Sequence, residues 1–439
     1  MKKIGLLSAV FLALALFVYL YEIEGGKERE AEKERQESLF RFKQEDISRL
    51  EIEPPGQEVI ALAKEGPEWL LKKPIESGVD RFTVDALLRK LTEARRDRTL
   101  PKDAQQPGQY GLDSPRLRLT VQAAGRKRSL KVGGEDYTKT KVYVQFEGDE
   151  EVHLTAKSVF DSANKKLLDW RDKNLLNFDQ DKVRLVEISR PKGNIQLRKE
   201  GADWFLDQPL QERADSSAAS GLLSTLKYGK VVEFVAEEAQ DLKRYGLANP
   251  PVSVRLQEEG ADTWRQLELG KRNEESYFAR DPERSPVFTV RQAVYEKLTQ
   301  KLWEFRDKQV VHVKQSQLQR CLIRRQDEEI AVSRDGDAWI IESPQAQRGQ
   351  KPLVYKFWTP IEDLKFESIE DRKSDPEDPA FKNPDVRIEL TLEDGSVHSF
   401  ELVEEDNTYR ARQLSSGRQG TVSKDAFEKL QYKAEDITS

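Results

Sequence analysis

At 439 residues the chain is too long for one ordinary hydrophobic core, and a typical domain length of about 150 residues predicts roughly three domains. Its 73 basic and 79 acidic residues are well mixed and give a net charge of −6, which argues against a basic nucleic-acid surface and against an acidic tail. Because charged residues (35%) are almost as frequent as hydrophobic ones (37%), the composition favours several small units over one large globule.

The chain begins with the pattern of a membrane segment. Lys2 and Lys3 precede an apolar run from Ile4 to Tyr21 that contains no charged residue. As a helix, this run would be about 27 Å long, close to the ~30 Å hydrocarbon core of a bilayer. Because lysines precede the run and tyrosines end it, we predict a transmembrane anchor over residues 1–21 in the cytoplasmic (inner) membrane, with the N-terminus inside and the bulk of the chain periplasmic or extracytoplasmic. A cleaved signal peptide is the alternative, although the run is long for one and offers no small-x-small cleavage site.

Residues 22–44 form a charged segment, which is dominated by Glu, Lys, Arg and Gln up to Ser38. Opposite charges stand three residues apart, as in Lys27 and Glu30. Such pairs stabilise a helix by about a few tenths of a kcal/mol each. The pattern therefore predicts a solvated helical stalk, and a flexible tether is an equally good interpretation of the same composition.

Three sets of landmarks then recur at a spacing of 135 residues. Each set begins with a tryptophan that is followed five residues later by a proline, and the three tryptophans are Trp69, Trp204 and Trp339. Two shorter motifs recur at the same spacing: they are Tyr110-Gly111-Leu112 with Tyr245-Gly246-Leu247, and Arg171-Asp172-Lys173 with Arg306-Asp307-Lys308. Self-similarity of this kind predicts tandem structural repeats. The predicted repeats span residues 45–180, 181–315 and 316–439.

The order of elements is most easily predicted in the first repeat. Short apolar strand patterns precede and include Trp69, and Asp80 then begins a helical pattern with one apolar stripe. Residues 117–154 alternate apolar and polar side chains, which predicts an antiparallel meander, and a second helical pattern follows at residues 159–168. The predicted fold class is therefore α+β: an N-terminal transmembrane helix followed by three repeats, each an antiparallel sheet meander with two covering helices.

The third repeat is expected to be degenerate. It retains Trp339 and apolar helix positions, although Pro360 should shorten or kink that helix, and it lacks both the Tyr-Gly-Leu and the Arg-Asp-Lys motif. Terminal repeats are often atypical because one face meets solvent, so we predict a capping role.

The recurring motifs supply the candidate contact residues. We interpret Gly111 and Gly246 as residues that end a helix with positive φ, with Tyr110 and Tyr245 packed beside them. The Arg-Asp-Lys motifs could form a docking surface for a partner, but an arginine and an aspartate at a repeat boundary more readily form an ion pair that fixes neighbouring repeats. The candidate inter-repeat or partner contacts are Arg171, Asp172, Lys173, Arg306, Asp307, Lys308, Tyr110 and Tyr245.

These landmarks resemble those of bacterial proteins that carry the domain of unknown function numbered 4340, over about 390 residues of this chain. The resemblance implies single-pass membrane proteins whose genes often lie beside ABC-2 type export machinery, including transporters of the gliding-motility type. It implies no catalytic residue.

We predict no catalytic, cofactor-binding or metal-binding residues in this chain. His153, His312 and His398 are the only histidines and stand one in each repeat, and Cys321 is the single cysteine, so neither a helical histidine pair nor a disulfide is available. No Gly-x-Ser-x-Gly or phosphate-binding P-loop motif occurs. A pair of carboxylates for glycoside hydrolysis stays open, because acidic residues are abundant.

The sequence thus leads to two expectations of function. The first is a non-enzymatic, single-pass membrane-anchored accessory subunit outside the cytoplasmic membrane, which binds ABC-2 type permease subunits or their cargo but no nucleic acid and no small-molecule substrate. The second is a cell-envelope polymer-binding or scaffold protein. A hydrolase would require two acids to converge in a cleft.

Overall fold

The computed structural model describes residue 19 and residues 37–101, 107–326, 328–371 and 378–438. The chain divides into two compact units. The first unit comprises Met1–Asn174 together with Lys230–Val235, and the second comprises Leu175–Gly229 and Ala236–Ser439. The six residues from 230 to 235 therefore belong by contact to the first unit, although the sequence places them in the second repeat.

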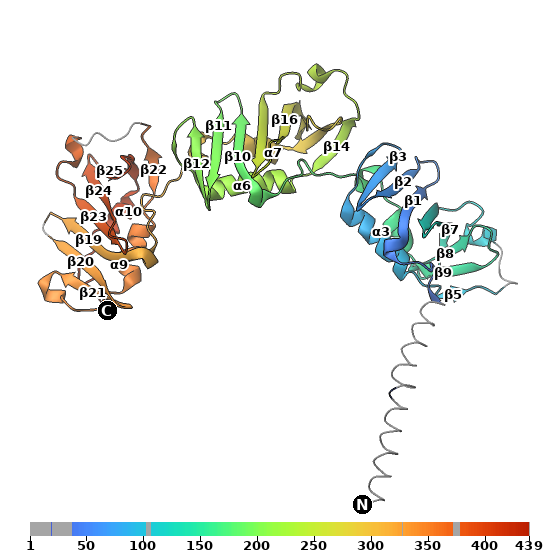
Figure 1. The fold of residues 1–439 in the computed structure, drawn as a ribbon, viewed down its shortest axis with the longest axis horizontal. Helices are drawn as coiled ribbons and strands as arrows, with labels where there is room; N and C mark the ends of the chain where they lie inside the picture. The colour runs from blue at the N-terminus through green and yellow to red at the C-terminus, as the bar shows by residue number, and fades with distance from the viewer. Residues whose placement is uncertain (1–18, 20–36, 102–106, 327, 372–377, 439) are drawn as a thin grey trace, which may run out of the picture. The chain divides into compact units, whose positions relative to one another are not determined.

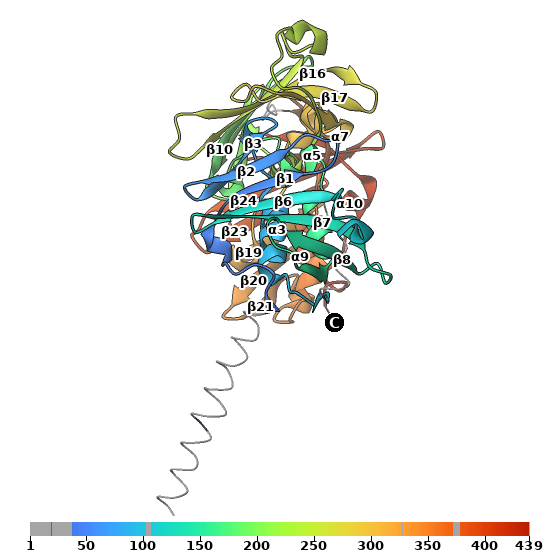
Figure 2. The same cartoon turned by 90° about the vertical axis from the view of Figure 1, so that its right-hand side faces the viewer.

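The first repeat is built around one antiparallel sheet of nine strands in the order β4-β3-β2-β1-β6-β7-β8-β9-β5. Figure 2 shows the central strands β2, β1, β6, β7 and β8 side by side. The strands are β1 (Ile47–Glu53), β2 (Ile60–Glu65), β3 (Glu68–Lys73), β4 (Ser77–Gly78), β5 (Arg98–Thr99), β6 (Leu117–Ala123), β7 (Arg126–Glu135), β8 (Lys141–Phe146) and β9 (Val152–Ala156).

One face of this sheet is covered by the main core of the repeat. The opposite face is polar around β1, and at β8 and β9 it is partly covered by a small cluster that contains Leu112, Tyr143 and Val152. Helix α3 (Arg81–Glu93) begins at Asp80, whose side chain accepts a hydrogen bond from the Thr83 backbone N–H at 2.9 Å. Its buried stripe packs in one core with Leu50 of β1. Because side chains alternate along a strand, the neighbouring Glu51 points to the opposite, polar face.

The second repeat has the same strand order over β13-β12-β11-β10-β15-β16-β17-β18. In Figure 1, helix α6 (Ser216–Tyr228) lies along one face of β10, β11 and β12. The strands are β10 (Val183–Ser189), β11 (Ile195–Glu200), β12 (Asp203–Gln208), β13 (Glu212–Arg213), β14 (Val231–Ala236), β15 (Val252–Glu258), β16 (Trp264–Asn273), β17 (Ser276–Arg280) and β18 (Val287–Arg291).

The third repeat forms an eight-stranded sheet in the order β21-β20-β19-β23-β24-β25-β26-β22. Helix α9 (Val354–Glu362) contains Pro360 and buries Phe357, Trp358 and Ile361 against it. The strands are β19 (Leu318–Arg325), β20 (Glu329–Asp335), β21 (Ala338–Ser343), β22 (Phe366–Ile369), β23 (Val386–Leu392), β24 (Val397–Glu405), β25 (Thr408–Gln413) and β26 (Gln419–Val422).

The recurring tryptophans occupy equivalent strands, which confirms the internal repeats. Trp69 lies in β3, Trp204 in β12 and Trp339 in β21, each opposite a basic residue of the preceding strand. Trp204 and Trp339 are buried and Trp69 is half-buried. The proline that follows each of them is preceded by a cis peptide bond in all three repeats.

The predicted positive φ of the Tyr-Gly-Leu glycines is confirmed. Gly111 has a φ of 69° and Gly246 a φ of 72°, and Gly246 ends a 3₁₀ helix (Leu242–Tyr245). The turn lies directly on the sheet, because the Tyr245 carbonyl meets the backbone of Gly270 in β16. A glycine is required there, since a Cβ on Gly270 would lie 2.1 Å from the Tyr245 oxygen.

The predicted α+β class with two covering helices per repeat is wrong. The described chain consists mainly of three antiparallel sheets, and α3, α6 and α9 are its longest helices, with 13, 13 and 9 residues. The second helix of each repeat is short: α4 (Ser158–Ala163), α7 (Gln292–Leu298) and α10 (Lys424–Glu428). In the first repeat Asn164 leaves helical geometry at φ −80° and ψ 67°, so the apolar pattern at 159–168 belongs to α4 and a separate turn, α5 (Leu167–Trp170).

The prediction of an N-terminal transmembrane helix is also corrected. Among the residues that the structure describes, no helix is long and apolar enough to cross a membrane. Apart from Tyr19, the predicted anchor over residues 1–21 and the stalk as far as residue 36 lie outside the described residues. The rest of the predicted stalk is not a stalk, because Leu39 and Phe40 are buried in the core of the first repeat. That repeat therefore begins before residue 45.

We expect Gly270→Ala to lower the free energy of unfolding by about 1–3 kcal/mol, because the added methyl group must displace the Tyr245 carbonyl. Urea unfolding followed by tryptophan fluorescence measures the change. Gly221→Ala in α6 is the matched control: its methyl group would meet only the flexible end of Lys297, at 3.3 Å. That variant should be neutral or more stable by up to about 1 kcal/mol, since alanine favours helix. Equal stabilities for both variants would contradict the close approach at Gly270.

Candidate functional site

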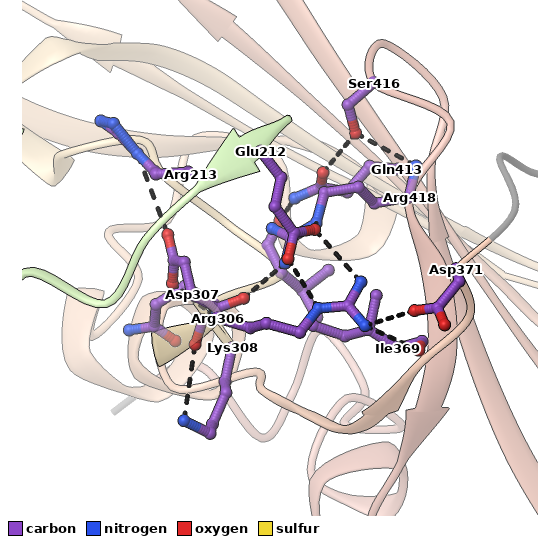
Figure 3. Close-up of polar contacts among 12 residues, drawn as sticks. Glu212, Arg213, Arg306, Asp307, Lys308, Ile369, Asp371, Gln413, Ser416 and Arg418 are labelled. Carbon is purple, nitrogen blue, oxygen red and sulfur yellow. Dashed lines mark hydrogen bonds and ion pairs between the residues drawn. The ribbon is translucent and has the colours of Figure 1, made fainter. Parts of the chain in front are cut away.

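The second Arg-Asp-Lys motif lies in an extended segment that connects the second and third sheets. The segment follows α8 (Leu302–Phe305). On one side, the Asp307 backbone N–H donates to the carbonyl of Arg213 in β13 at 3.2 Å. On the other side, the N–H of Phe366 in β22 donates to the Lys308 carbonyl at 2.8 Å. We call residues 305–309 the second joint, and Figure 3 shows its polar contacts.

Arg306 is the buried centre of the second joint. Its Nε donates to Glu212 Oε1 at 2.6 Å, and its Nη2 donates to Oε2 of the same carboxylate at 3.2 Å. Nη1 donates to Asp371 at 2.7 Å and to the Ile369 carbonyl at 3.3 Å. The side chains of Arg306 and Glu212 are only 7% and 11% exposed, so this bidentate pair is largely shielded from water. Figure 3 shows Arg306 between Glu212 and Asp371.

The charges around Arg306 form a connected network. Burial acts to lower the pKa of Arg306, but the hydrogen bonds and negative charges of Glu212 and Asp371 outweigh it, so this pKa is raised. Arg418 approaches the same carboxylate, with its Nε 3.7 Å from Glu212 Oε2, and donates to the Asp307 carbonyl. Burial lowers the pKa of Arg418 despite these acidic neighbours.

Asp307 fixes the polypeptide just beyond Arg306. Its carboxylate accepts the backbone N–H of Gln309 at 2.9 Å and contacts His312. Burial alone would raise the pKa of Asp307, but the hydrogen bond and charge of His312, the Gln309 N–H and the charge of Arg418 together lower it. Lys308 faces away from this carboxylate, with its Nζ 5.2 Å from the centre of the Trp303 ring.

The first Arg-Asp-Lys motif has the same backbone pairing within the first unit. The Asp172 N–H donates to the Gly78 carbonyl of β4 at 3.0 Å, and the Val231 N–H donates to the Lys173 carbonyl at 2.8 Å. The side-chain contacts differ, because Arg171 stacks on the ring of Phe234, 3.4 Å from its centre. We call residues 170–174 the first joint.

Tyr110 and Tyr245 belong to different surroundings from the joints. The Tyr110 ring packs beside Tyr143 with centres 4.4 Å apart, in a small cluster with Leu112. The Tyr245 ring packs against Phe278 at 5.1 Å in the equivalent cluster of the second repeat. Both tyrosines therefore anchor the Tyr-Gly-Leu turn to its own sheet.

The residues around Arg306 were not identified from the sequence. Glu212, Asp371 and Arg418 lie 94, 65 and 112 residues away along the chain. Glu212 is not a recurring landmark, because Ser77 stands at the equivalent place in the first repeat. No local pattern could have identified these residues, since only strand pairing brings them to Arg306.

The other reactive side chains are scattered. No group of three or more His, Cys, Asp and Glu that could hold a metal ion occurs within the described part of the chain. His153 is buried in β9, its Nδ1 lies 2.9 Å from Thr99 Oγ1, and burial followed by the charge of Arg96 lowers its pKa. Burial raises the pKa of the Cys321 thiol to about 12, so very little thiolate exists at neutral pH.

Three similar antiparallel sheets connected by extended joints define a tandem-repeat β protein. A family model described as "Domain of unknown function (DUF4340)" matches residues 69–226 and 204–384, and the chain belongs to this family.

A comparison with curated proteins finds no match. Among solved structures, the chain shows a weak similarity to a DnaN sliding clamp (DNA polymerase III subunit beta) from Pseudomonas aeruginosa bound to griselimycin. The TM-score is 0.13 at 7% identity, over 86% of this chain and 91% of that one, which is too low to support any argument.

We expect Arg306→Met to destabilise the second unit by about 3 kcal/mol or more, because Glu212 is left buried without its bidentate partner. Adding Glu212→Leu should recover part of this loss, and the double-mutant cycle measures the coupling. Lys424→Gln breaks an ion pair whose side chains are 60% and 59% exposed, and should cost less than about 1 kcal/mol. A loss no larger for Arg306→Met than for this control would rule out a stabilising role for the pair.

We expect the stabilising effect of the Asp307 carboxylate to depend on pH. Because its pKa is lowered in the folded protein, the stabilisation is complete above the ordinary aspartate pKa of about 3.9 and is lost as the pH falls through the lowered value. Asp307→Asn should therefore lower the melting temperature more at pH 7 than at about pH 3. Melting curves of the wild-type protein and of the variant at the two pH values test this. A difference in melting temperature that is larger at about pH 3 than at pH 7 would contradict the prediction.

Proposed function

We propose that this protein is a non-enzymatic accessory subunit on the extracytoplasmic side of the cytoplasmic membrane, where its repeats bind an ABC-2 type transporter or the cargo of that transporter. The observation that supports it best is the second joint, in which the buried Arg306 is bonded to Glu212 of the second sheet and to the Ile369 carbonyl of the third. A fixed connection between the second and third sheets suits a protein in which these two sheets bind a partner together. The choice of an ABC-2 permease as partner follows from the family resemblance.

The polar faces of the sheets are the surface we propose for partner binding. Arg49 and Glu51 lie on this face in the first repeat, and Glu187 and Arg255 form an ion pair on it in the second. Antiparallel sheets tolerate one solvated face, and charged side chains arranged on such a face favour a specific partner by electrostatic complementarity.

Affinity purification tests the proposal. The full chain carries a C-terminal tag and is recovered from detergent-solubilised native membranes after mild crosslinking. We expect ABC-2 permease subunits to co-purify, and Glu187→Arg on the polar face to reduce their recovery. Glu296→Arg, an exposed position on α7, makes the same change in charge on the opposite side of the sheet and should leave recovery unchanged. Recovery of no transporter subunit under any of these conditions would reject the proposal.

A second candidate, binding of a cell-envelope polymer, is favoured by two hollows on the same polar faces. One hollow of about 460 Å³ lies over several strands of the second sheet. Its polar lining residues include Gln196, Gln208 and Gln266. A smaller one of about 230 Å³ lies over Thr120 and Gln122 of the first sheet. Amide and hydroxyl groups can both donate and accept hydrogen bonds, as sugar hydroxyls require.

Co-sedimentation with isolated cell-wall material separates the two candidates. If the polymer is the ligand, the purified full chain should sediment with the wall in the absence of any membrane protein, and Gln208→Ala with Gln266→Ala should weaken this. If the transporter is the partner, sedimentation should not exceed that of an unrelated protein of similar charge.

A further inference from the structure

A pocket of about 540 Å³ lies in the first repeat, where the chain enters the sheet. Four arginines line it from three parts of the fold. Arg41 belongs to the segment before β1, Arg96 follows α3, and Arg126 and Arg128 lie in β7. The pocket is large enough for a small organic ligand, since such pockets typically have volumes of about 300–1,000 Å³.

Two carboxylates, Asp46 and Asp149, line the pocket with the four arginines, so its positive charge is only partly compensated. Arg128 donates to Asp149 at 3.0 Å, whereas Arg41, Arg96 and Arg126 form no ion pair with any residue that the structure describes. The Nε of Arg96 is buried and has no hydrogen-bond partner in the described chain. Burial, followed by the positive charges of Arg41 and Arg128, lowers the pKa of Arg96, and the negative charges of Glu151 and Asp149 offset this only in part. An anion in the pocket would reduce the repulsion between the arginines and could accept a hydrogen bond from Arg96 Nε.

Phenylalanine rings form the apolar wall of the pocket. Phe40 and Phe146 are buried with ring centres 5.3 Å apart, and Phe42 lies 5.0 Å from Phe40. The guanidinium carbon of Arg128 stands 4.3 Å from the centre of the Phe146 ring. A ligand there would meet charge on one side and aromatic carbon on the other.

Comparison with the other repeats shows that Arg96 is not required by the fold. The Arg96 N–H donates to the Glu37 carbonyl at 2.6 Å, which is the same backbone contact that Val231 and Phe366 make at the two joints. Val231 and Phe366 are buried apolar residues, as this position favours. An arginine here carries a desolvation cost that an apolar residue avoids, so a ligand offers a reason for its presence.

From this geometry we propose that the first repeat binds an organic phosphate, with Arg41 and Arg96 holding the phosphate oxygens and Phe42 contacting the apolar part. Guanidinium groups pair with phosphate through parallel hydrogen bonds, and a phosphate accepts such bonds from several directions at once. Arginines that approach from different elements match this better than they match a planar carboxylate. The phosphate group is common to a phospholipid headgroup and to a soluble organic phosphate, and the experiment distinguishes these sources.

Isothermal titration calorimetry of the purified full chain tests the proposal with three probes: dihexanoyl phosphatidic acid below its micelle concentration, phenyl phosphate, and inorganic phosphate. We expect both organic probes to bind more tightly than inorganic phosphate. Tighter binding of the phosphatidic acid than of phenyl phosphate points to a lipid, and the reverse order to a soluble ligand. Arg96→Gln should weaken binding of all three probes about tenfold or more.

Two variants make the test independent of folding defects. Arg41 is exposed, so Arg41→Gln should leave the fold intact and still weaken all three probes. Phe42→Ala should weaken the organic probes and leave inorganic phosphate unchanged. Arg89→Gln, on the exposed side of α3, removes the same charge outside the pocket and should change nothing. Binding of no probe at about 10 mM, or equal losses in Arg89→Gln and Arg41→Gln, would overturn the proposal.

Discussion

The constraint on which this structure depends is the hydrogen bonding of the two joints. Each joint is a single extended segment whose backbone groups are paired on both sides, to β4 and residue 231 in the first unit and to β13 and β22 in the second. Buried N–H and carbonyl groups must find partners, so each segment is fixed to the residues with which it pairs. The arginine that begins each motif is buried as a result. The cost of removing its charge from water must be offset by contacts of its side chain.

Different groups lie beside the two arginines. Arg306 is held by the carboxylates of Glu212 and Asp371, whereas Arg171 lies on the ring of Phe234. The backbone pairing is thus retained, while Glu212 is replaced by Ser77 at the equivalent place in the first repeat. The equivalent residues Arg96, Val231 and Phe366 show the same pattern. Their backbone N–H groups make the same hydrogen bond in each repeat, but the side chain is an arginine in the first repeat and apolar in the other two. Repeats that share a scaffold can in this way acquire different surfaces.

Much of the local structure could be predicted from the sequence. The spacing of 135 residues between tryptophans identified the repeats, and Asp80 identified the start of α3. The positive φ at Gly246 followed from its place in a recurring turn. The number of helices was predicted less well, because residues 159–168 have a helical apolar pattern that Asn164 divides. Periodicity reports which face is buried, but not whether a helix continues.

By itself, the sequence determined the period of the repeats, the elements that begin each one and the residues that recur at their boundaries, because these properties depend on neighbours along the chain. Only the tertiary structure decided that Glu212, Asp371 and Arg418 surround Arg306, and that Arg41, Arg96 and Arg128 face one pocket. These residues come from different strands and loops. Their proximity results from strand order and register, which bring distant segments together without leaving a repeated pattern in the chain.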